Sequence, residues 1–128
     1  ILFNFITLND DAHLKNFSLI ERNGEYRLSP AYDLINTSLQ LRNPRIFALD
    51  KGLFKEGMKL SDTRTICRSD FVEFGKRIGL QERVIQQELK NFSTVQPMVK
   101  ELLERSFLSA ELKEHYYLSY KYRCLMLR

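Results

Sequence analysis

The sequence contains little of what several protein classes require. Of its 128 residues, five are Gly, three are Pro and two are Cys, and Trp is absent. So little Gly and Pro excludes a collagen-like or low-complexity chain. The two cysteines, Cys67 and Cys124, have no Cys or His at ligand spacing, which indicates neither a zinc site nor a disulfide framework. We expect both to be small buried apolar residues of a reducing, cytoplasmic protein.

Long apolar runs and a dominant charge are also missing. No run approaches the roughly 18 residues that a membrane-spanning helix needs. Lys and Arg number 20 against 16 Asp and Glu, and the net charge of +4 is spread along the chain, which disfavours a dedicated nucleic-acid binder. With 44% hydrophobic residues, the composition predicts a single soluble globular domain over residues 1–128.

The N-terminal eight residues are almost wholly apolar. They read as the last turns of a buried helix, which ends at Asn9-Asp10-Asp11 because these side chains compete with helical hydrogen bonds. The chain starts without Met and without the features of a signal peptide. We therefore expect the sequence to be a fragment of a longer protein.

A β-hairpin is predicted after this helix. The strand-like runs 17–21 and 25–29 are separated by Arg22-Asn23-Gly24, and Asn-Gly is a strong local signal for a tight hairpin turn. The apolar residues on either side of Asn43-Pro44 can also be interpreted as a second hairpin. Residues 50–66 show no regular spacing of apolar residues, and we expect them to be irregular.

From residue 69 the apolar period becomes helical, and we expect a bundle over 69–128. Asp70 and Glu73 are spaced as a capping pair, Gly79 stops the first helix, and Ser109 caps the last. Pro97 is tolerated in the first turn of the third helix. The overall prediction is an α+β fold, mainly α with a small β-hairpin region. The four apolar stripes are Phe71, Phe74 and Ile78; Val84, Ile85, Leu89 and Phe92; Val95, Val99, Leu102, Leu103 and Phe107; and Leu112, Tyr116, Tyr120, Cys124 and Leu127.

One constellation points to chemistry. Asp11 and Asn16 have the spacing of a protein-kinase catalytic loop, in which the Asp accepts the substrate hydroxyl proton and the Asn holds a metal ion. The hairpin folds the chain back, so that Asp33 could supply a second ligand to the same Mg²⁺, which prefers hard oxygen donors.

Simpler interpretations of these residues stay open. Short polar residues most often cap helices and build turns, and Asp10 could replace Asp11 if the register is wrong. His13 could act as a base, but loop histidines more often hydrogen-bond the backbone. Lys15 could approach a phosphate or be an ordinary solvated lysine.

The runs 9–18 and 26–34 resemble the catalytic core of the HipA-like serine/threonine kinases of bacterial toxin–antitoxin systems. The match is dense over residues 1–37, the catalytic loop and metal-ligand hairpin, and weaker through the helices after 69. The resemblance implies a protein-kinase-like C-terminal lobe in which Asp11 is the catalytic base and Asn16 and Asp33 bind Mg²⁺. It also implies that His13 and Lys15 shape the loop.

The same resemblance implies the partners. ATP would be the phosphate donor, a protein such as an aminoacyl-tRNA synthetase the acceptor, and a DNA-binding antitoxin a binding partner. The phosphate-covering loop and the ATP-pairing lysine of an N-terminal lobe are not found in this sequence.

Two alternatives from other classes remain. The chain could be a non-catalytic lobe that docks an antitoxin or another protein. Less favoured is a nucleic-acid-binding domain that uses the Tyr-rich segment 116–123, because Tyr116 and Tyr120 lie on the apolar stripe and are expected in the core, with Lys121 and Arg123 in water.

These expectations predict that the 128-residue chain alone transfers no phosphate, because the lobe that grips ATP from above is missing. Incubation of the purified chain with labelled ATP and Mg²⁺ measures this directly. Phosphate transfer by the chain alone would contradict the prediction.

Overall fold

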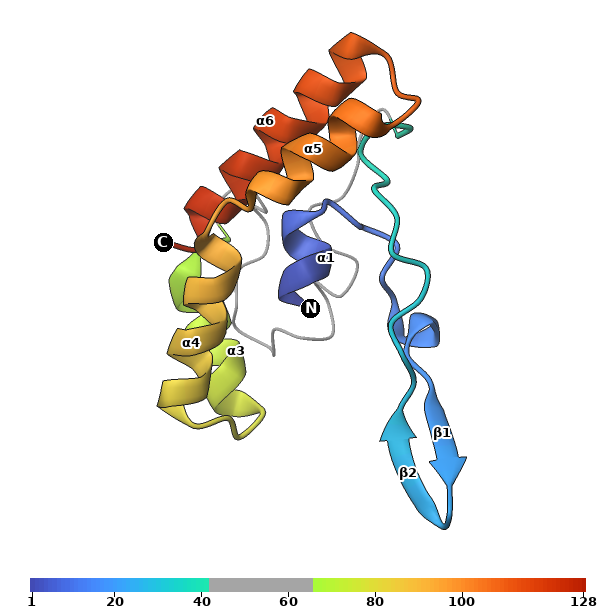
Figure 1. The fold of residues 1–128 in the computed structure, drawn as a ribbon. Helices are drawn as coiled ribbons and strands as arrows, with labels where there is room; N and C mark the ends of the chain where they lie inside the picture. The colour runs from blue at the N-terminus through green and yellow to red at the C-terminus, as the bar shows by residue number, and fades with distance from the viewer. Residues whose placement is uncertain (42–65) are drawn as a thin grey trace.

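A computed structural model describes residues 1–41 and 66–128, which form a mainly helical structure with one two-stranded hairpin (Figure 1). This agrees with the predicted α+β class. Among the described residues no helix is long and apolar enough to cross a membrane. The elements are α1 (Leu2–Ile6), the 3₁₀ turn η1 (Leu14–Asn16), β1 (Leu19–Arg22), β2 (Glu25–Leu28), α3 (Arg68–Arg77), α4 (Glu82–Ser93), α5 (Pro97–Arg105) and α6 (Ala110–Met126).

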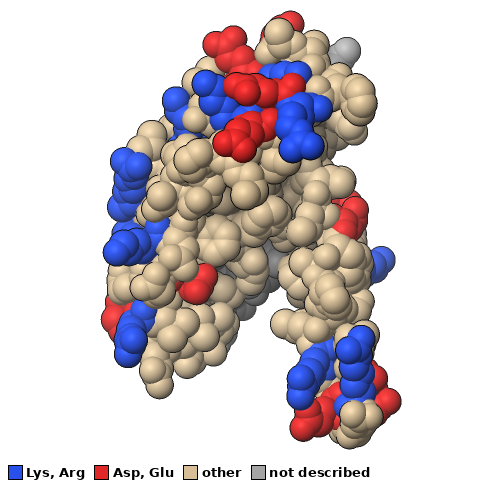
Figure 2. Space-filling model, viewed as in Figure 1, with Lys and Arg blue, Asp and Glu red and all other residues tan. Residues whose placement is uncertain are grey.

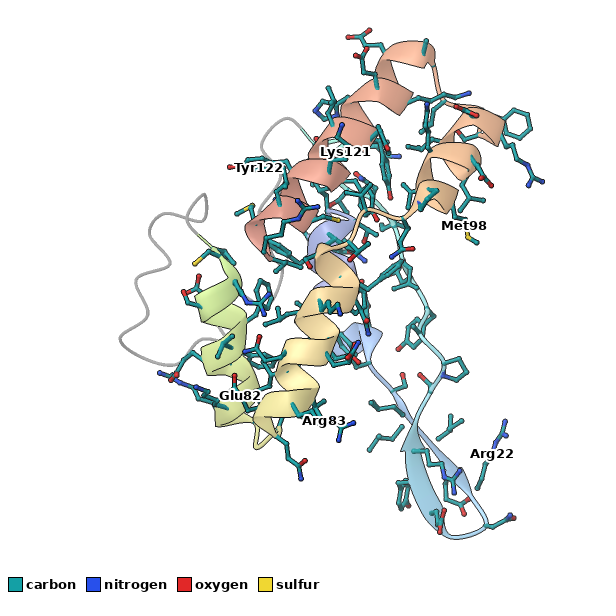
Figure 3. The ribbon with its side chains drawn as sticks, turned by 60° about the vertical axis from the view of Figure 1, so that its left-hand side comes forward. Arg22, Glu82, Arg83, Met98, Lys121 and Tyr122 are labelled. Carbon is teal, nitrogen blue, oxygen red and sulfur yellow. The ribbon has the colours of Figure 1, made fainter. Side chains whose placement is uncertain are left out.

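The hairpin forms where the Asn-Gly signal places it. Asn23 and Gly24 both adopt positive φ angles, 56° and 80°, as a tight two-residue hairpin turn requires. The strands pair antiparallel, with Leu19 opposite Leu28. The hairpin projects away from the helices (Figure 1), and Arg22 lies near its far end (Figure 3).

The core lies where α1 meets the later helices. Phe5 is fully buried and its ring meets that of Phe71 edge-on, with centroids 4.9 Å apart. This packing buries one face of α1, the helix that precedes the predicted catalytic loop, whereas Phe3 on α1 is 43% exposed. The buried cluster comprises Phe5, Ile6, Ile66, Phe71, Ile85, Leu89, Tyr120, Cys124 and Leu127.

Helix α3 starts earlier than the capping pair predicted. Cys67 is the N-cap residue, and its backbone N–H donates to Asp70 Oδ2 at 2.8 Å, whereas Glu73 accepts from Arg77 Nε at 2.6 Å. The predicted Asp70–Glu73 pair is therefore wrong by one turn, because Asp70 occupies the third helical position rather than the cap. Gly79 does stop the helix, with φ at 81°.

Helices α5 and α6 form an antiparallel pair (Figure 1). Pro97 is the first residue of α5, and Ser109 caps α6 by accepting from the Leu112 N–H at 3.3 Å, both as predicted. The buried Tyr120 hydroxyl accepts a hydrogen bond from the Gln96 N–H at 3.0 Å, which ties α6 to the start of α5.

Some predicted core positions are exposed. Phe107 lies beyond the end of α5 and is fully exposed, and Ile78, Val84 and Leu102 are 55%, 42% and 57% exposed. Cys67 is exposed, contrary to expectation, whereas Cys124 is buried. Each helix of this small structure buries only a narrow stripe, so an apolar residue at the margin stays in solvent. The hairpin proposed around Asn43-Pro44 lies outside the described residues.

Arg123 corrects another expectation, because it is buried rather than solvated. It is 7% exposed, and its guanidinium carbon lies 4.8 Å from the centre of the Phe5 ring. Burial lowers the pKa of Arg123 to about 10, which leaves it charged at neutral pH. The face of the Phe5 ring therefore stabilises the buried positive charge of Arg123 through a cation–π contact.

The packing of α3 on α4 leads to a stability prediction. A Cβ on Gly75 would lie 2.7 Å from Ile85 Cγ1, and overpacking of this kind costs about 1–3 kcal/mol, more than the gain of about 1 kcal/mol in helix propensity. We expect Gly75→Ala to lower the free energy of unfolding, measured by urea denaturation.

The matched control is Gly75→Ala in an Ile85→Ala background, where the clash is gone. There the same change should raise the free energy of unfolding. A destabilising effect of equal size in both backgrounds would show that the contact with Ile85 does not limit position 75.

Candidate active site

The predicted catalytic loop connects α1 to the hairpin. Asn9, its first residue, is 1% exposed, and its Oδ1 accepts a hydrogen bond from the Asp11 N–H at 3.1 Å. This is the local turn that Asn side chains favour. Helix α1 has already ended at Ile6, earlier than the predicted end at Asn9, and Leu8 has a positive φ of 57°. The Asn9 turn then directs the chain towards Asp11.

Asn16, at the end of η1, joins the two other predicted site residues. Its Nδ2 donates to the backbone oxygen of Asp11 at 2.9 Å and to Asp33 Oδ2 at 2.9 Å. The hairpin thus returns the chain so that Asn16 and Asp33 are in direct contact across 17 residues of sequence. This is the proximity that the sequence pattern predicts.

Asp33 has an unusual backbone conformation, with φ at 54°. Among non-glycine residues, Asp and Asn tolerate this left-handed region best. Its carbonyl oxygen accepts a hydrogen bond from Asn9 Nδ2 at 3.0 Å. The conformation turns the exposed carboxylate towards Asn16, and the bond from Asn9 holds it there.

Asp11 presents its carboxylate to solvent. The Asp11 side chain is 56% exposed and that of His13 is 48% exposed, and His13 Nε2 lies 3.8 Å from Asp11 Oδ1. A protonated His13 would form a weak, solvent-screened ion pair here. Asp11 is therefore accessible to a substrate, and His13 is its side-chain neighbour.

The Lys15 side chain is exposed, and the Lys15 backbone carbonyl accepts a hydrogen bond from the segment that leads to Asp33. The Tyr32 hydroxyl donates to the Lys15 carbonyl oxygen at 3.1 Å and lies 2.6 Å from Ser18 Oγ. These contacts fasten the segment before Asp33 to the end of the catalytic loop.

Thr37 holds the chain in place on the C-terminal side of Asp33. It is 8% exposed, and its hydroxyl donates to the Leu8 carbonyl oxygen at 3.0 Å while it accepts from the Asp10 N–H at 3.0 Å. The segment 33–37 is thus tied to residues on both sides of Asn9. Asp10 faces this junction through its backbone N–H.

The donor set fits a hard divalent cation. Within the described residues, Asn16 Oδ1 and Asp33 Oδ1 form no hydrogen bonds, so both oxygens are available as ligands on side chains that contact each other through Asn16 Nδ2 and Asp33 Oδ2. No group of three His, Cys, Asp or Glu side chains suited to a metal occurs in the described part of the chain. A pair of oxygen ligands fits Mg²⁺, because Mg²⁺ usually keeps several waters and binds one or two protein ligands together with substrate phosphates.

A cavity of about 370 Å³ adjoins these residues. It lies between α1 and the base of the hairpin, where the space-filling view shows the hairpin standing apart from the helical part (Figure 2). Asn16 and Asp33 contribute to its wall, which is otherwise largely apolar and includes Phe3, Phe17 and Leu28. The polar pair therefore stands beside an apolar space of ligand size.

The sequence interpretation missed three residues that position this site: Asn9, Tyr32 and Thr37. The spacing of Asn9 and Asp11 is a recognisable signal for a side-chain turn. The contacts of Tyr32 and Thr37 join residues 14 to 29 positions apart, and a local pattern carries no signal for them.

The Thr37 junction gives a testable prediction. Thr37→Val keeps the side-chain shape but leaves the Asp10 N–H without its partner, which should lower the free energy of unfolding by about 1–3 kcal/mol. Thermal or urea unfolding measures this. Thr37→Ser retains the hydroxyl and should recover most of the loss, whereas an equal loss in both variants would mean that the methyl group matters more than the hydrogen bonds.

Comparison with known proteins identifies the family of this chain. Residues 1–99 match the family described as the HipA-like C-terminal domain. The match includes every predicted site residue and ends within α5, so that α6 lies beyond it.

A curated relative supports the same family. A Haemophilus influenzae protein named "Putative kinase" is 36% identical over 98 residues, which cover 70% of this chain and 29% of the relative. The chain thus spans less than a third of the length of that relative. The chain therefore belongs to the HipA-like C-terminal domain family.

Proposed function

We propose that this chain is the catalytic C-terminal lobe of a kinase that transfers phosphate from ATP to serine or threonine hydroxyls of proteins, with Mg²⁺. The observation that carries the proposal is the contact of Asn16 with Asp33 at 2.9 Å. Membership of the HipA-like family and the similarity to a protein named as a kinase support it.

Asp11 is the proposed general base. Its carboxylate is more than half exposed, so the hydroxyl of a protein side chain can reach it. Hydrogen bonding to Asp11 orients the hydroxyl oxygen, and one carboxylate oxygen takes the hydroxyl proton as the oxygen attacks phosphorus. His13, 3.8 Å away, is placed to influence the orientation of this carboxylate.

Asn16 Oδ1 and the Asp33 carboxylate are the proposed Mg²⁺ ligands. A Mg²⁺ held by these two residues would supply positive charge against the negative charge that develops on the phosphate oxygens. The hydrogen bond between the two side chains keeps both beside one position before any ligand binds. The cost of ordering them is thereby reduced.

The cavity beside this pair suits a nucleotide. Its volume of about 370 Å³ and apolar walls match the size and character of sites for small molecules. We place the base and ribose of ATP against this surface and the phosphates towards Asn16 and Asp33. The chain spans 29% of its curated relative, and we assign the opposite wall of the ATP site to an N-terminal lobe.

The protein partners follow from the family resemblance. We propose an acceptor protein of the aminoacyl-tRNA synthetase class and a DNA-binding antitoxin as binding partner. Direct nucleic-acid binding by α6 is less favoured by the structure, because Tyr120 and Arg123 are buried. Tyr122 does project outward from α6 (Figure 3).

A lobe that only docks another protein is the second candidate. Helix α5 and the turn that follows it favour this candidate, because Met98 and Leu102 of α5 and Phe107 of the turn are 66%, 57% and 108% exposed. Such a lobe would need neither Asp11 nor Asp33 for its function.

The test uses the full-length protein that carries this chain, with labelled ATP and Mg²⁺. Asp11→Asn and Asp33→Asn should each reduce phosphate transfer by about 100-fold or more, because one removes the base and the other a charged metal ligand. Asn at position 33 also tolerates the left-handed backbone, so the variant should remain folded.

The matched control is Asp10→Asn, which removes a neighbouring carboxylate outside the proposed machinery and should leave transfer near the wild-type rate. Loss of activity in Asp10→Asn but not in Asp11→Asn would reassign the base to Asp10. Retained activity in Asp33→Asn would exclude the proposed metal site, and retained partner binding without any transfer would favour the docking lobe.

A further inference from the structure

Asn9 is the most deeply buried polar residue at the site, at 1% exposed. Both ends of its amide are used: Oδ1 accepts from the Asp11 N–H at 3.1 Å and Nδ2 donates to the Asp33 carbonyl oxygen at 3.0 Å. One planar group therefore joins the residue of the proposed base to the residue of the proposed metal ligand, which lie 22 positions apart in the sequence.

Asn16 joins the same two residues on their other sides. Its Nδ2 donates to the Asp11 carbonyl oxygen and to the Asp33 carboxylate, both at 2.9 Å. The four residues Asn9, Asp11, Asn16 and Asp33 thus form a closed ring of hydrogen bonds. Asn9 is the buried member of the ring, whereas Asn16 and Asp33 line the cavity.

We infer that Asn9 is a positioning residue that fixes the metal-binding carboxylate of Asp33 relative to Asp11, and that it thereby sets the affinity of the site for divalent cations. The inference rests on the proposed function, since it concerns the same site. Asn9 itself is held away from solvent and touches no reacting atom.

The chemistry of the ring requires an amide at position 9. Asn offers a donor and an acceptor on one rigid side chain. Asp would bring an uncompensated negative charge into a buried place and lacks the donor. Ser can keep the turn with Asp11, because short hydroxyl side chains also bond the N–H two residues on, but it is too short to reach Asp33.

The hydrogen bond from Asn9 Nδ2 to the Asp33 carbonyl oxygen matters because Asp33 has a left-handed backbone conformation. A non-glycine residue at φ of 54° is held there by its surroundings, and the bond from Asn9 acts on the carbonyl of that same residue. Without it, the Asp33 carboxylate would sample other orientations. Residues that orient metal ligands in this way typically alter metal affinity by about 10- to 100-fold.

The test compares the full-length protein with its Asn9→Ser variant. One measurement is the apparent dissociation constant for Mn²⁺ without nucleotide, read by electron paramagnetic resonance, and the other is the Mg²⁺ concentration for half-maximal phosphate transfer. Asn9→Ala, which removes both hydrogen bonds of Asn9, is the second variant. It is measured in the same way if the melting temperature of Asn9→Ser lies below the assay temperature.

The matched control is Tyr120→Phe. It also removes one bond between a buried side chain and a backbone group, that to the Gln96 N–H, but in the helical part of the structure. We expect Asn9→Ser to raise the Mn²⁺ dissociation constant and the Mg²⁺ requirement by about tenfold or more, and Tyr120→Phe to change neither.

The outcomes separate the inference from the proposed function. A folded Asn9→Ser protein with wild-type Mn²⁺ affinity would overturn the positioning role even if the kinase is active, and so would a matching loss in Tyr120→Phe. If the wild-type protein transfers no phosphate but binds Mn²⁺ in a manner that depends on Asn9, the proposed function fails and the positioning role stands. Absence of Mn²⁺ binding by the wild-type protein would overturn the positioning role.

Discussion

The ring of hydrogen bonds through Asn9, Asp11, Asn16 and Asp33 is the constraint on which the rest of the site depends. Two amide side chains, one buried and one facing a cavity, join two segments separated by a hairpin. Because Asn9 lies only three residues beyond the end of α1, the packing of Phe5 in the core also fixes where the ring begins. The helical core thereby positions polar groups that are themselves largely exposed.

Local patterns were sufficient to predict much of this arrangement. The Asn23-Gly24 turn set the hairpin, and the helix stop at Gly79 and the cap at Ser109 lie where the sequence places them. The contact of Asn16 with Asp33 follows from a kinase-like spacing combined with a hairpin that reverses the chain. These features depend on backbone preferences of single residues or on short-range pairing, which a sequence displays directly.

The remaining features of the fold and the site depend on tertiary contacts, which local sequence patterns do not show. Thr37 and Tyr32 act through bonds to distant parts of the chain. Arg123 is buried because α6 packs it against Phe5, whereas the exposed Phe107 lies past the end of its helix. A helical period shows which residues share a stripe but does not show how wide a stripe the neighbouring helices cover.

The most direct measurement of the central claim is the position of the metal ion in a crystal structure of the full-length protein with Mg²⁺ and a non-hydrolysable ATP analogue. The account predicts one Mg²⁺ about 2.0–2.1 Å from both Asn16 Oδ1 and a carboxylate oxygen of Asp33, with Asp11 beside the terminal phosphate and the base against the apolar cavity. An ion held by other residues, with neither Asn16 nor Asp33 among its ligands, would contradict it.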